Sequence, residues 1–310
     1  MQIKRIKRAI NGVLLLDKPV GITSNAALQI AKRLFQAEKA GHTGTLDPFA
    51  NGLLPLCFGE ATKFSQYLLD ADKTYFAVMQ LGVTTTTGDP EGEVLDTKPV
   101  NVSCDELHAA IARFIGPIEQ TPPMYSALKH QGKPLYEYAR AGIEIARKSR
   151  LIHIRTIKLC AFDGAQATIN VRCSSGTYIR TLAEDIGKML GCGAHLIALT
   201  RTASGGFHLD QAVSLVTLEH SDLTARDQLL LPVDGLVTYL PRIELSSPEA
   251  AALLNGQRQI LAAYTQLSGL VRAYDTQQRF LGLVELQADG LAIARRLMNS
   301  SSSPRQNPAQ

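Results

Sequence analysis

The order of the predicted helices and strands constrains this fold more than any other feature of the sequence. Apolar residues at helical spacing predict helices, and short runs rich in β-branched and aromatic residues predict strands. These elements do not follow one another as regular β-α-β units, so we predict an α+β fold rather than a doubly wound one. The predicted helices are 24–36, 103–116 and 177–191, and the main predicted strands are 73–82, 151–162 and 167–175.

Local signals predict how several of these elements begin and end. Ser24 is a candidate N-cap for the first helix, and Ser103 with Glu106 forms a capping-box pattern ahead of the second. Gly191 is expected to end the third helix. The stretch "TTTTGDPEGEV", residues 84–94, is predicted to be an exposed loop.

The chain changes character after about residue 210. A leucine-rich connector leads to three short β-like runs separated by polar turns, which predict a small β-rich module. The final ten residues, "SSSPRQNPAQ", are rich in serine and proline and are expected to be disordered. The three β-like runs are residues 269–275, 279–286 and 290–298.

Several classes of protein lack support in this sequence. No apolar run approaches the roughly 20 residues of a membrane span, and no signal peptide is recognisable, so we expect a cytoplasmic protein without membrane contact. The five cysteines contain no C-x-x-C pair, which argues against a disulfide framework and a structural zinc site. Phosphate-binding glycine loops are also missing. We therefore expect neither a metal nor another cofactor.

Positive charge is concentrated in one segment. Between Lys129 and Lys158 the sequence has eight Lys and Arg residues against two Glu residues, an excess of 8 − 2 = +6, whereas the whole chain carries +4. Such a segment suits a polyanion, and nucleic acid in particular. The alternative is a solvated surface strip, and charge alone does not separate the two interpretations.

The stretch "GHTGTLDPFANGLLP", residues 41–55, holds a single carboxylate, Asp47. Asp followed by Pro commonly begins a turn or caps a helix, because proline presets φ and the carboxylate accepts a backbone N–H. Local spacing alone favours that structural interpretation. The three glycines of the stretch would let the backbone approach a large ligand, which favours a reactive Asp47.

Two further stretches hold candidate functional residues. In "CSSGTYIRT", residues 173–181, Arg180 lies in the first turn of a predicted helix and could clamp a carboxylate by two hydrogen bonds. The alternative is an exposed Arg180 beside a packed Tyr178. Tyr75 opens a predicted strand, where an aromatic residue usually belongs to the core.

Five motifs occur here in the order and at the spacing of one known family, the bacterial TruB family of tRNA pseudouridine-55 synthases. The resemblance runs from about residue 10 to residue 206 and continues more weakly through the C-terminal module. Where the family often has lysine in the last motif, this chain has Ser175, which weakens a possible RNA contact. The motifs are "LLLDKPVGITSN", "AGHTGTLDPFANGLLP", "DKTY", "PPMYSALK..G..LYEYAR.G" and "CSSGTYIRTLAEDIG".

The resemblance implies both a fold and an activity. The fold would be a mixed, mainly antiparallel sheet flanked by helices, followed by a small PUA-like β-rich domain. The activity would be isomerisation of uridine 55 in the T loop of tRNA, by a monomer that needs no cofactor, metal or protein partner. The implied domains are a basic extension at 1–10, a catalytic domain at 11–240 with an RNA-gripping insertion at about 122–150, a PUA-like domain at 241–300 and a tail at 301–310.

The resemblance also implies roles for individual residues. Asp47 matches the nucleophilic aspartate, Arg180 the arginine that pairs with it, and Tyr75 the tyrosine that stacks on the flipped base. The remaining matched positions are expected to contact the substrate RNA: His42, Tyr178, Leu199, Lys18, Lys129 and Lys133.

Two other functions remain open at this stage. The basic surface would equally serve an RNA-binding or RNA-folding protein without catalysis. A nucleoside or glycoside hydrolase would also attack C1′ with a carboxylate, but it usually needs a second acid. No second carboxylate lies near Asp47 in the sequence, although a distant one remains open.

Overall fold

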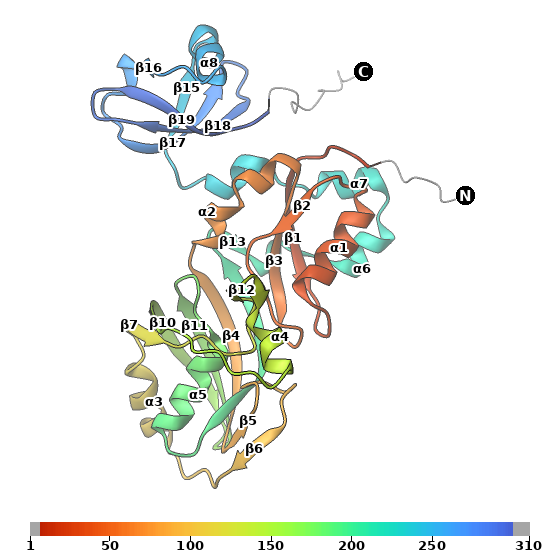
Figure 1. The fold of residues 1–310 in the computed structure, drawn as a ribbon, viewed down its shortest axis with the longest axis vertical. Coiled ribbons are helices and arrows are strands. Elements are labelled where there is room, and N and C mark those ends of the chain that lie inside the picture. The colour runs from red at the N-terminus through yellow and green to blue at the C-terminus, as the bar shows by residue number, and fades with distance from the viewer. Residues whose placement is uncertain (1–6, 300–310) are drawn as a thin grey trace.

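The computed structural model describes residues 7–299, which form one large mixed sheet and a smaller C-terminal sheet (Figure 1). The large sheet has ten strands, with the path β14-β1-β3-β12-β4-β11-β10-β7; β13 pairs with β12, and β2 with β3. Only β1–β14 and β3–β12 are parallel pairs. Its strands are β1 (Gly12–Lys18), β2 (Ala40–His42), β3 (Asn51–Phe58), β4 (Lys73–Leu81), β7 (Gly116–Gln120), β10 (Arg150–Phe162), β11 (Gln166–Cys173), β12 (Ala194–Ser204), β13 (Phe207–His208) and β14 (Val213–Ser214).

Helices cover the two halves of this sheet separately. One half packs α3 (Cys104–Ala112) and α5 (Ile179–Met189) into a core with β4, β10, β11 and β12. The other half packs α1 (Ser24–Leu34) and α6 (Leu215–His220) against β1 and β3. The predicted α+β fold with a mainly antiparallel sheet is therefore confirmed. The shorter helices nearby are α2 (Ser65–Leu69), α7 (Leu223–Gln228), η1 (Gly59–Lys63), η2 (Leu209–Gln211) and η3 (Val233–Val237).

The amphipathic pattern of α5 explains why that helix lies on the sheet. Ile179, Leu182, Ala183 and Ile186 recur at helical spacing and are all buried, so one apolar stripe faces the strands. The helix is followed by Gly191 at φ +82°, which allows the chain to turn back toward β12. Because Arg180 lies on the buried side of the first turn, this packing also fixes where its guanidinium points.

The predicted helix caps are partly confirmed. The capping box of Ser103 and Glu106 is present at the start of α3. The prediction for α1 is wrong, because Thr23 is the N-cap and Ser24 is the first helical residue. The Ser24 hydroxyl instead bonds to the backbone of Leu46, so it serves a loop distant in sequence rather than its own helix.

The stretch predicted to be an exposed loop is a hairpin with a buried interior. Strands β5 (Val83–Thr85) and β6 (Val94–Thr97) flank it, and Thr85 and Asp89 are 6% and 3% exposed. The exposed-loop prediction is wrong for these two residues, because Asp89 is drawn inward by an arginine from α5.

The basic insertion forms a short hairpin and one helix. Strands β8 (Lys129–His130) and β9 (Lys133–Pro134) pair, and α4 (Leu135–Arg140) follows directly. The chain then runs without regular structure to the start of β10 at Arg150. The insertion thus begins and ends beside the main sheet, and α4 lies beside its centre in the view of Figure 1.

The C-terminal module is a five-stranded sheet of order β15-β17-β18-β19-β16 with its own core. The three predicted β-like runs are β17, β18 and β19. The Phe64 and Phe280 rings, 5.3 Å apart, join this module to the part of the chain that forms the large sheet. Its elements are β15 (Arg242–Leu245), α8 (Ser247–Leu254), β16 (Gln259–Ile260), η4 (Ala262–Tyr264), β17 (Gly269–Asp275), β18 (Phe280–Leu286) and β19 (Leu291–Leu297).

Some predictions fall outside what the structure describes. The tail at 301–310 and the first six residues of the basic extension are not among the described residues. The residue limits proposed for the domains stay predictions. Between residues 7 and 299, no helix has the length and apolar character needed to cross a membrane.

Candidate active site

A cavity of about 370 Å³ lies where the Asp47 loop, β4, β12 and the start of α5 meet. Its volume falls in the range of small-ligand pockets, about 300–1,000 Å³. Five of the predicted site residues line it together although they are far apart in the chain: Asp47, Tyr75, Tyr178, Arg180 and Leu199.

The loop that carries Asp47 runs between β2 and β3 and is anchored from two sides. The Ser24 hydroxyl donates to the Leu46 carbonyl at 3.0 Å and accepts from the Leu46 N–H at 2.8 Å. Lys18 Nζ donates to the carbonyls of Pro19 at 2.8 Å and Ile22 at 2.7 Å. A longer contact of 3.5 Å joins it to the carbonyl of the residue after Asp47.

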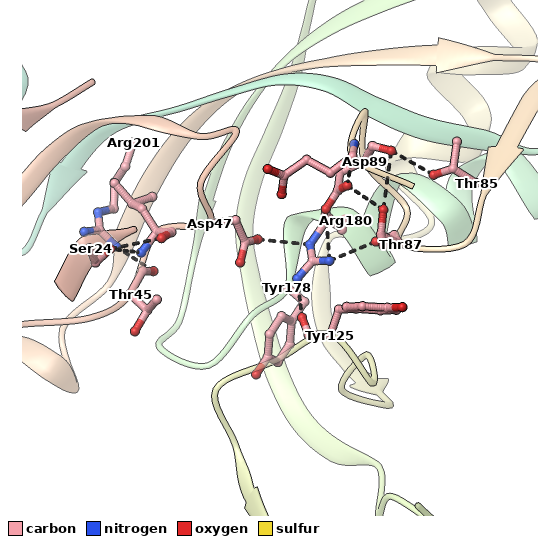
Figure 2. Close-up of polar contacts among 12 residues, drawn as sticks. Ser24, Thr45, Asp47, Thr85, Thr87, Asp89, Tyr125, Tyr178, Arg180 and Arg201 are labelled. Atoms are coloured by element: carbon pink, nitrogen blue, oxygen red, sulfur yellow. Dashed lines mark hydrogen bonds and ion pairs between the residues drawn. The ribbon is translucent and has the colours of Figure 1, made fainter. Parts of the chain in front are cut away.

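Arg201 on β12 holds the loop from a third side, and sequence reasoning missed it. It is 1% exposed, and its Nε donates to the Leu53 carbonyl at 2.7 Å. Its two terminal nitrogens reach the carbonyls of Gly44 at 3.3 Å and Thr45 at 3.5 Å. Figure 2 shows Arg201 beside Thr45. A Cβ on Gly52 would lie 2.5 Å from the Arg201 carbonyl, so this glycine permits close approach to β12 rather than to a ligand.

The Arg180 guanidinium lies at the centre of the site, and Figure 2 shows its contacts. Its Nε is 3.0 Å from Asp47 Oδ2, so the predicted pairing of these two residues is present. Its Nη1 donates to the Thr87 carbonyl at 2.8 Å and to Asp89 Oδ2 at 3.1 Å, and its Nη2 donates to the Tyr125 carbonyl at 2.6 Å. Because only Nε reaches Asp47, the predicted clamp by two hydrogen bonds is wrong.

Asp89 is the second carboxylate on Arg180, and sequence reasoning missed it as well. Its other oxygen, Oδ1, accepts from the Thr87 hydroxyl and from the Glu91 N–H, the latter at 3.0 Å. The Asp89 carbonyl accepts from the buried Thr85 hydroxyl at 2.9 Å. The turn-forming pair Asp89–Pro90 was a visible signal, but its arginine partner is 91 residues away in the chain.

The two carboxylates differ in their exposure. The Asp89 side chain is 4% exposed, whereas 34% of the Asp47 side chain is exposed. Burial raises the pKa of the Asp47 carboxyl, and the positive charges of Arg180 and Lys18 oppose that rise. A carboxylate with a raised pKa is a stronger nucleophile and base than a free aspartate.

Tyr75 and Leu199 supply the apolar wall of the cavity. Tyr75 on β4 pairs with Arg201 on β12, and burial raises the pKa of its phenol. Leu199 is 6% exposed and belongs to the core beneath the cavity. An aromatic ring and an aliphatic side chain in one wall suit the flat face of a base.

Tyr178 forms another wall at the N-terminus of α5. The Arg150 guanidinium lies 5.0 Å from the centre of its ring. The Gln120 side chain accepts from the Tyr178 N–H at 2.7 Å and donates to its carbonyl at 3.0 Å. Gln120 is 1% exposed and is a third functional neighbour that no sequence motif indicated.

Four predicted site residues do not line the cavity: Lys18, His42, Lys129 and Lys133. Lys18 is 0% exposed and its ammonium is surrounded by carbonyls, so a substrate contact by Lys18 does not fit this structure. Burial lowers the pKa of Lys18 to about 8. His42 is part-buried on β2, and burial followed by the charge of Arg201 lowers its pKa. The other two lysines are exposed on the β8–β9 hairpin.

The residues that line the cavity carry carboxylate, guanidinium, ammonium, hydroxyl, aromatic and aliphatic groups. In the part of the chain that the structure describes, no group of three or more His, Cys, Asp or Glu residues is arranged to hold a metal ion. The site offers a carboxylate beside a cation in a partly closed cavity, and this arrangement supports nucleophilic or proton-transfer chemistry on a flat, ring-shaped substrate.

Known proteins resemble this chain over nearly its whole length. The N-terminal domain model of the TruB family pseudouridylate synthases matches residues 32–179. The tRNA pseudouridylate synthase B C-terminal domain matches 180–238, and the C-terminal model of pseudouridine synthase II TruB matches 241–298. The tRNA pseudouridine synthase B of Thiobacillus denitrificans is 61% identical over 296 residues, which cover 96% of this chain and 98% of that protein.

Two further matches agree with this one. The tRNA pseudouridine synthase B of Chromobacterium violaceum is 56% identical, over 94% of this chain and 96% of that protein. A chain in the crystal structure of a Cbf5-Nop10-Gar1 complex has a TM-score of 0.68 and 28% identity, and the match covers 90% of this chain and 79% of that one. The chain therefore belongs to the TruB family of pseudouridylate synthases.

Proposed function

We propose that this protein converts uridine 55 in the T loop of tRNA to pseudouridine, with Asp47 as the nucleophile. The observation that carries the proposal is the Asp47 carboxylate, which lies 3.0 Å from Arg180 in a cavity with Tyr75 and Leu199 in its wall. The similar proteins of two bacteria, both named tRNA pseudouridine synthase B, support the reaction and the tRNA substrate.

The reaction changes two bonds and leaves the atoms in balance. The N1–C1′ bond breaks, the uracil turns, and a C5–C1′ bond forms in its place. The proton on C5 is lost and N1 gains one, so no atom is added or removed. This chemistry needs a nucleophile or base, a place for the detached base and protection from water.

The geometry around Asp47 suits the first of these needs. Arg180 engages Oδ2, whereas among the described residues no hydrogen bond or ion pair holds Oδ1. One carboxylate oxygen is thus oriented by the guanidinium and the other is left for the sugar or the base. The free oxygen serves three routes equally: attack at C1′, attack at C6, or removal of a proton from C2′.

The cavity walls suit the base. A uridine in a folded loop must leave its stack before an enzyme reaches C1′ or C6, at a cost of a few kcal/mol. Stacking on the Tyr75 ring would return about 1–3 kcal/mol. Leu199 and Tyr178 would close the cavity around the detached uracil and keep water from the sugar.

The hydrolase alternative requires a second acid, and Asp89 shares Arg180 with Asp47. Both Asp89 oxygens already accept hydrogen bonds, from Arg180, from the Thr87 hydroxyl and from a backbone N–H. Both oxygens of Asp89 are therefore occupied by the contacts that position Arg180 and hold the hairpin. These contacts do not favour Asp89 as the second acid of a hydrolase.

Contact with the T arm is proposed for the basic insertion. Lys129 and Lys133 are exposed on its hairpin, where their ammonium groups would meet phosphates. The proposal has the protein act as a monomer, in the cytoplasm and without a protein partner.

The test is the release of tritium from C5 of uridine in an unmodified tRNA transcript. The proposal predicts one tritium released per transcript, at the target uridine, with the RNA chain intact and no free uracil. Binding without tritium release would favour the non-catalytic RNA-binding alternative. Free uracil in solution would favour the hydrolase.

A further inference from the structure

The two ends of the basic insertion, residues 122–150, both reach the cavity. Ser126 lies near the first residue of the insertion and Arg150 is its last residue, and both line the cavity wall. The carbonyl of Tyr125, the residue before Ser126, accepts the 2.6 Å hydrogen bond from Arg180. The segment around Ser126 is therefore part of the site and not only of the surface around it.

The Ser126 hydroxyl is buried and has no hydrogen-bond partner. The residue is 5% exposed, and its Oγ is among the few buried polar side-chain atoms of the described chain that no donor or acceptor reaches. Its backbone is held in place, because its N–H donates to the Met124 carbonyl at 2.9 Å and its carbonyl accepts from the Tyr136 N–H at 3.2 Å.

Most other polar side chains around the cavity are already engaged by the protein. Lys73 Nζ donates to the carbonyls of residues 68, 69 and 71, and the Arg201 guanidinium donates to those of residues 44, 45 and 53. The Thr177 hydroxyl donates to the Ser174 carbonyl at 3.0 Å. Arg150 keeps an unpartnered Nε, but its Nη2 is anchored on the Gly176 carbonyl.

An unpartnered buried hydroxyl lowers the stability of a folded protein, because it has lost its hydrogen bonds to water. The cost disappears when a ligand supplies a partner, and a ligand in this cavity would lie beside Ser126. We propose that the Ser126 hydroxyl hydrogen-bonds the polar edge of the flipped uracil and holds that edge while the base is detached. The inference rests on the proposed function and assigns a substrate contact to that same site.

The chemistry of uracil fits such a contact. Flipping removes the pairing partners of O2, N3–H and O4, and enzymes that flip a base usually replace them on that edge. A hydroxyl both donates and accepts, so it serves a ring carbonyl or N3–H. Tyr75 would cover the face of the ring, and Ser126 would supply the directional contact that a stacked face lacks.

The first test compares Ser126→Ala with Ser204→Ala, a matched control. Ser204 Oγ is also buried and without a partner, but the residue does not line the cavity. We expect neither variant to lower the melting temperature, because each removes an unpartnered hydroxyl. Ser126→Ala should lower kcat/KM for tritium release about 10-fold, as expected for one hydrogen bond, and Ser204→Ala should leave it unchanged. Equal activities would overturn the proposal, as would a marked fall in the melting temperature of Ser126→Ala.

The second test separates this contact from the proposed function as a whole. Two T-arm hairpin RNAs, one with uridine and one with an abasic site at the target position, are bound to Asp47→Asn and to Asp47→Asn/Ser126→Ala. Loss of the hydroxyl should weaken binding of the uridine RNA about 10-fold, or 1.4 kcal/mol, and leave the abasic RNA unaffected. Equal weakening of both RNAs would overturn the contact with the base. If wild type releases no tritium, the proposed function fails, whereas this binding comparison still decides the contact.

Discussion

Two loops place a carboxylate on the same guanidinium and differ in almost everything else. The loop between β2 and β3 brings Asp47 to Arg180 Nε and leaves one carboxylate oxygen facing the cavity. The β5–β6 hairpin brings Asp89 to Arg180 Nη1 and engages both of its oxygens inside the protein. An identical functional group is thus held ready to react in one loop and is used to hold the arginine in the other.

The difference lies in what surrounds each carboxylate. Asp89 is buried with partners that stabilise its anion, which is the arrangement of a structural charge. Asp47 has one cation and a partly open side, and burial raises its pKa. Asp47 and Asp89 have the same side chain but differ in burial and in hydrogen-bond partners. We therefore infer the role of each aspartate from its surroundings and not from its residue type.

Removing the shared cation should have the largest effect on stability. Arg180→Met leaves both Asp47 and Asp89 without their guanidinium, and we expect the free energy of unfolding to fall by about 5 kcal/mol at pH 7. The loss should shrink at low pH, because protonation removes the unpaired charges. Chemical denaturation at pH 5 and pH 7 measures this. Arg172→Met is the control, because the exposed ion pair of Arg172 with Asp72 contributes less than about 1 kcal/mol. A similar loss of stability in both variants would contradict the claim that Arg180 stabilises the two carboxylates.

Removing only the contact between Asp89 and Arg180 should have the next largest effect on stability. Asp89→Asn keeps the shape of the side chain but removes its charge, and we expect a loss of about 3 kcal/mol in unfolding free energy. Arg180 would then be less firmly held, and a misplacement of its guanidinium should slow tritium release about 100-fold. Full activity in a stably folded Asp89→Asn protein would show that Arg180 does not need this anchor.

Weakening the anchor of the Asp47 loop should lower stability less than Asp89→Asn does. Ser24→Ala leaves the buried Leu46 N–H without its partner, and we expect a loss of about 1.5 kcal/mol together with slower tritium release, because the Asp47 loop is less firmly held. Thr23→Ala is the matched control. It removes the α1 cap at a similar cost of about 1 kcal/mol, but it should leave activity unchanged. Equal tritium release by the two variants would show that anchoring of the Asp47 loop by Ser24 does not contribute to catalysis.

The smallest expected effect concerns Glu184, one turn along α5 from Arg180. A Cβ on Gly88 would lie 2.7 Å from its carboxylate, so it packs against the Asp89 hairpin. Burial raises its pKa to about 7. Because the folded state holds this proton to higher pH than the unfolded chain, wild type loses stability as pH rises from about 4.5 through 7. Glu184→Gln should therefore be more stable than wild type by less than about 1 kcal/mol at pH 8, and no more stable at pH 4.5.

The control for this last prediction is Glu106, whose pKa is lowered by its hydrogen bonds to Ser103. Its contribution to stability is complete above the ordinary range of a glutamate, near 4.5, and is lost as the pH falls through its lowered pKa. The effect of Glu106→Gln should thus be flat between pH 6 and pH 8. A pH dependence of Glu184→Gln that is equally flat would contradict the raised pKa of Glu184.

The sequence predicted which residues line the cavity better than it predicted their hydrogen-bond and ion-pair partners. Asp47, Tyr75, Tyr178 and Arg180 lie in the motifs that carry the family resemblance, Leu199 is a further position that the resemblance implied, and the structure brings all five together. The α+β fold and the three strands of the C-terminal module followed from periodicity, which reports the burial of one face. These features depend on local patterns, and local patterns are visible in a single sequence.

The residues that hold the site were not predictable in the same way. Arg201, Gln120 and Asp89 act through partners 58 to 157 residues away in the chain. Asp89 sits in a run of threonine, glycine and proline that is typical of an exposed turn. Only the tertiary structure shows that Arg180 of α5 is buried and contacts Asp89.

Two individual errors have the same origin. Lys18 was expected to contact RNA, as lysines often do, but it is enclosed by carbonyls at the base of the Asp47 loop. Arg180 was expected to clamp Asp47 with two nitrogens, whereas its other nitrogens are taken by Thr87, Asp89 and Tyr125. In both cases the residue type indicated what the group could bind, and the tertiary structure decided what it does bind.

The central claim is that Asp47 reacts whereas Asp89 holds the arginine. The most direct test is single-turnover tritium release by Asp47→Asn, measured beside its tRNA affinity and its unfolding free energy. We predict a rate at least about 1,000-fold below that of wild type, unchanged tRNA binding, and an unfolding free energy at pH 7 that is not lowered, because the substitution removes a carboxylate whose pKa is raised by burial. A rate within 10-fold of wild type, or a loss of stability equal to that of Asp89→Asn, would contradict the claim.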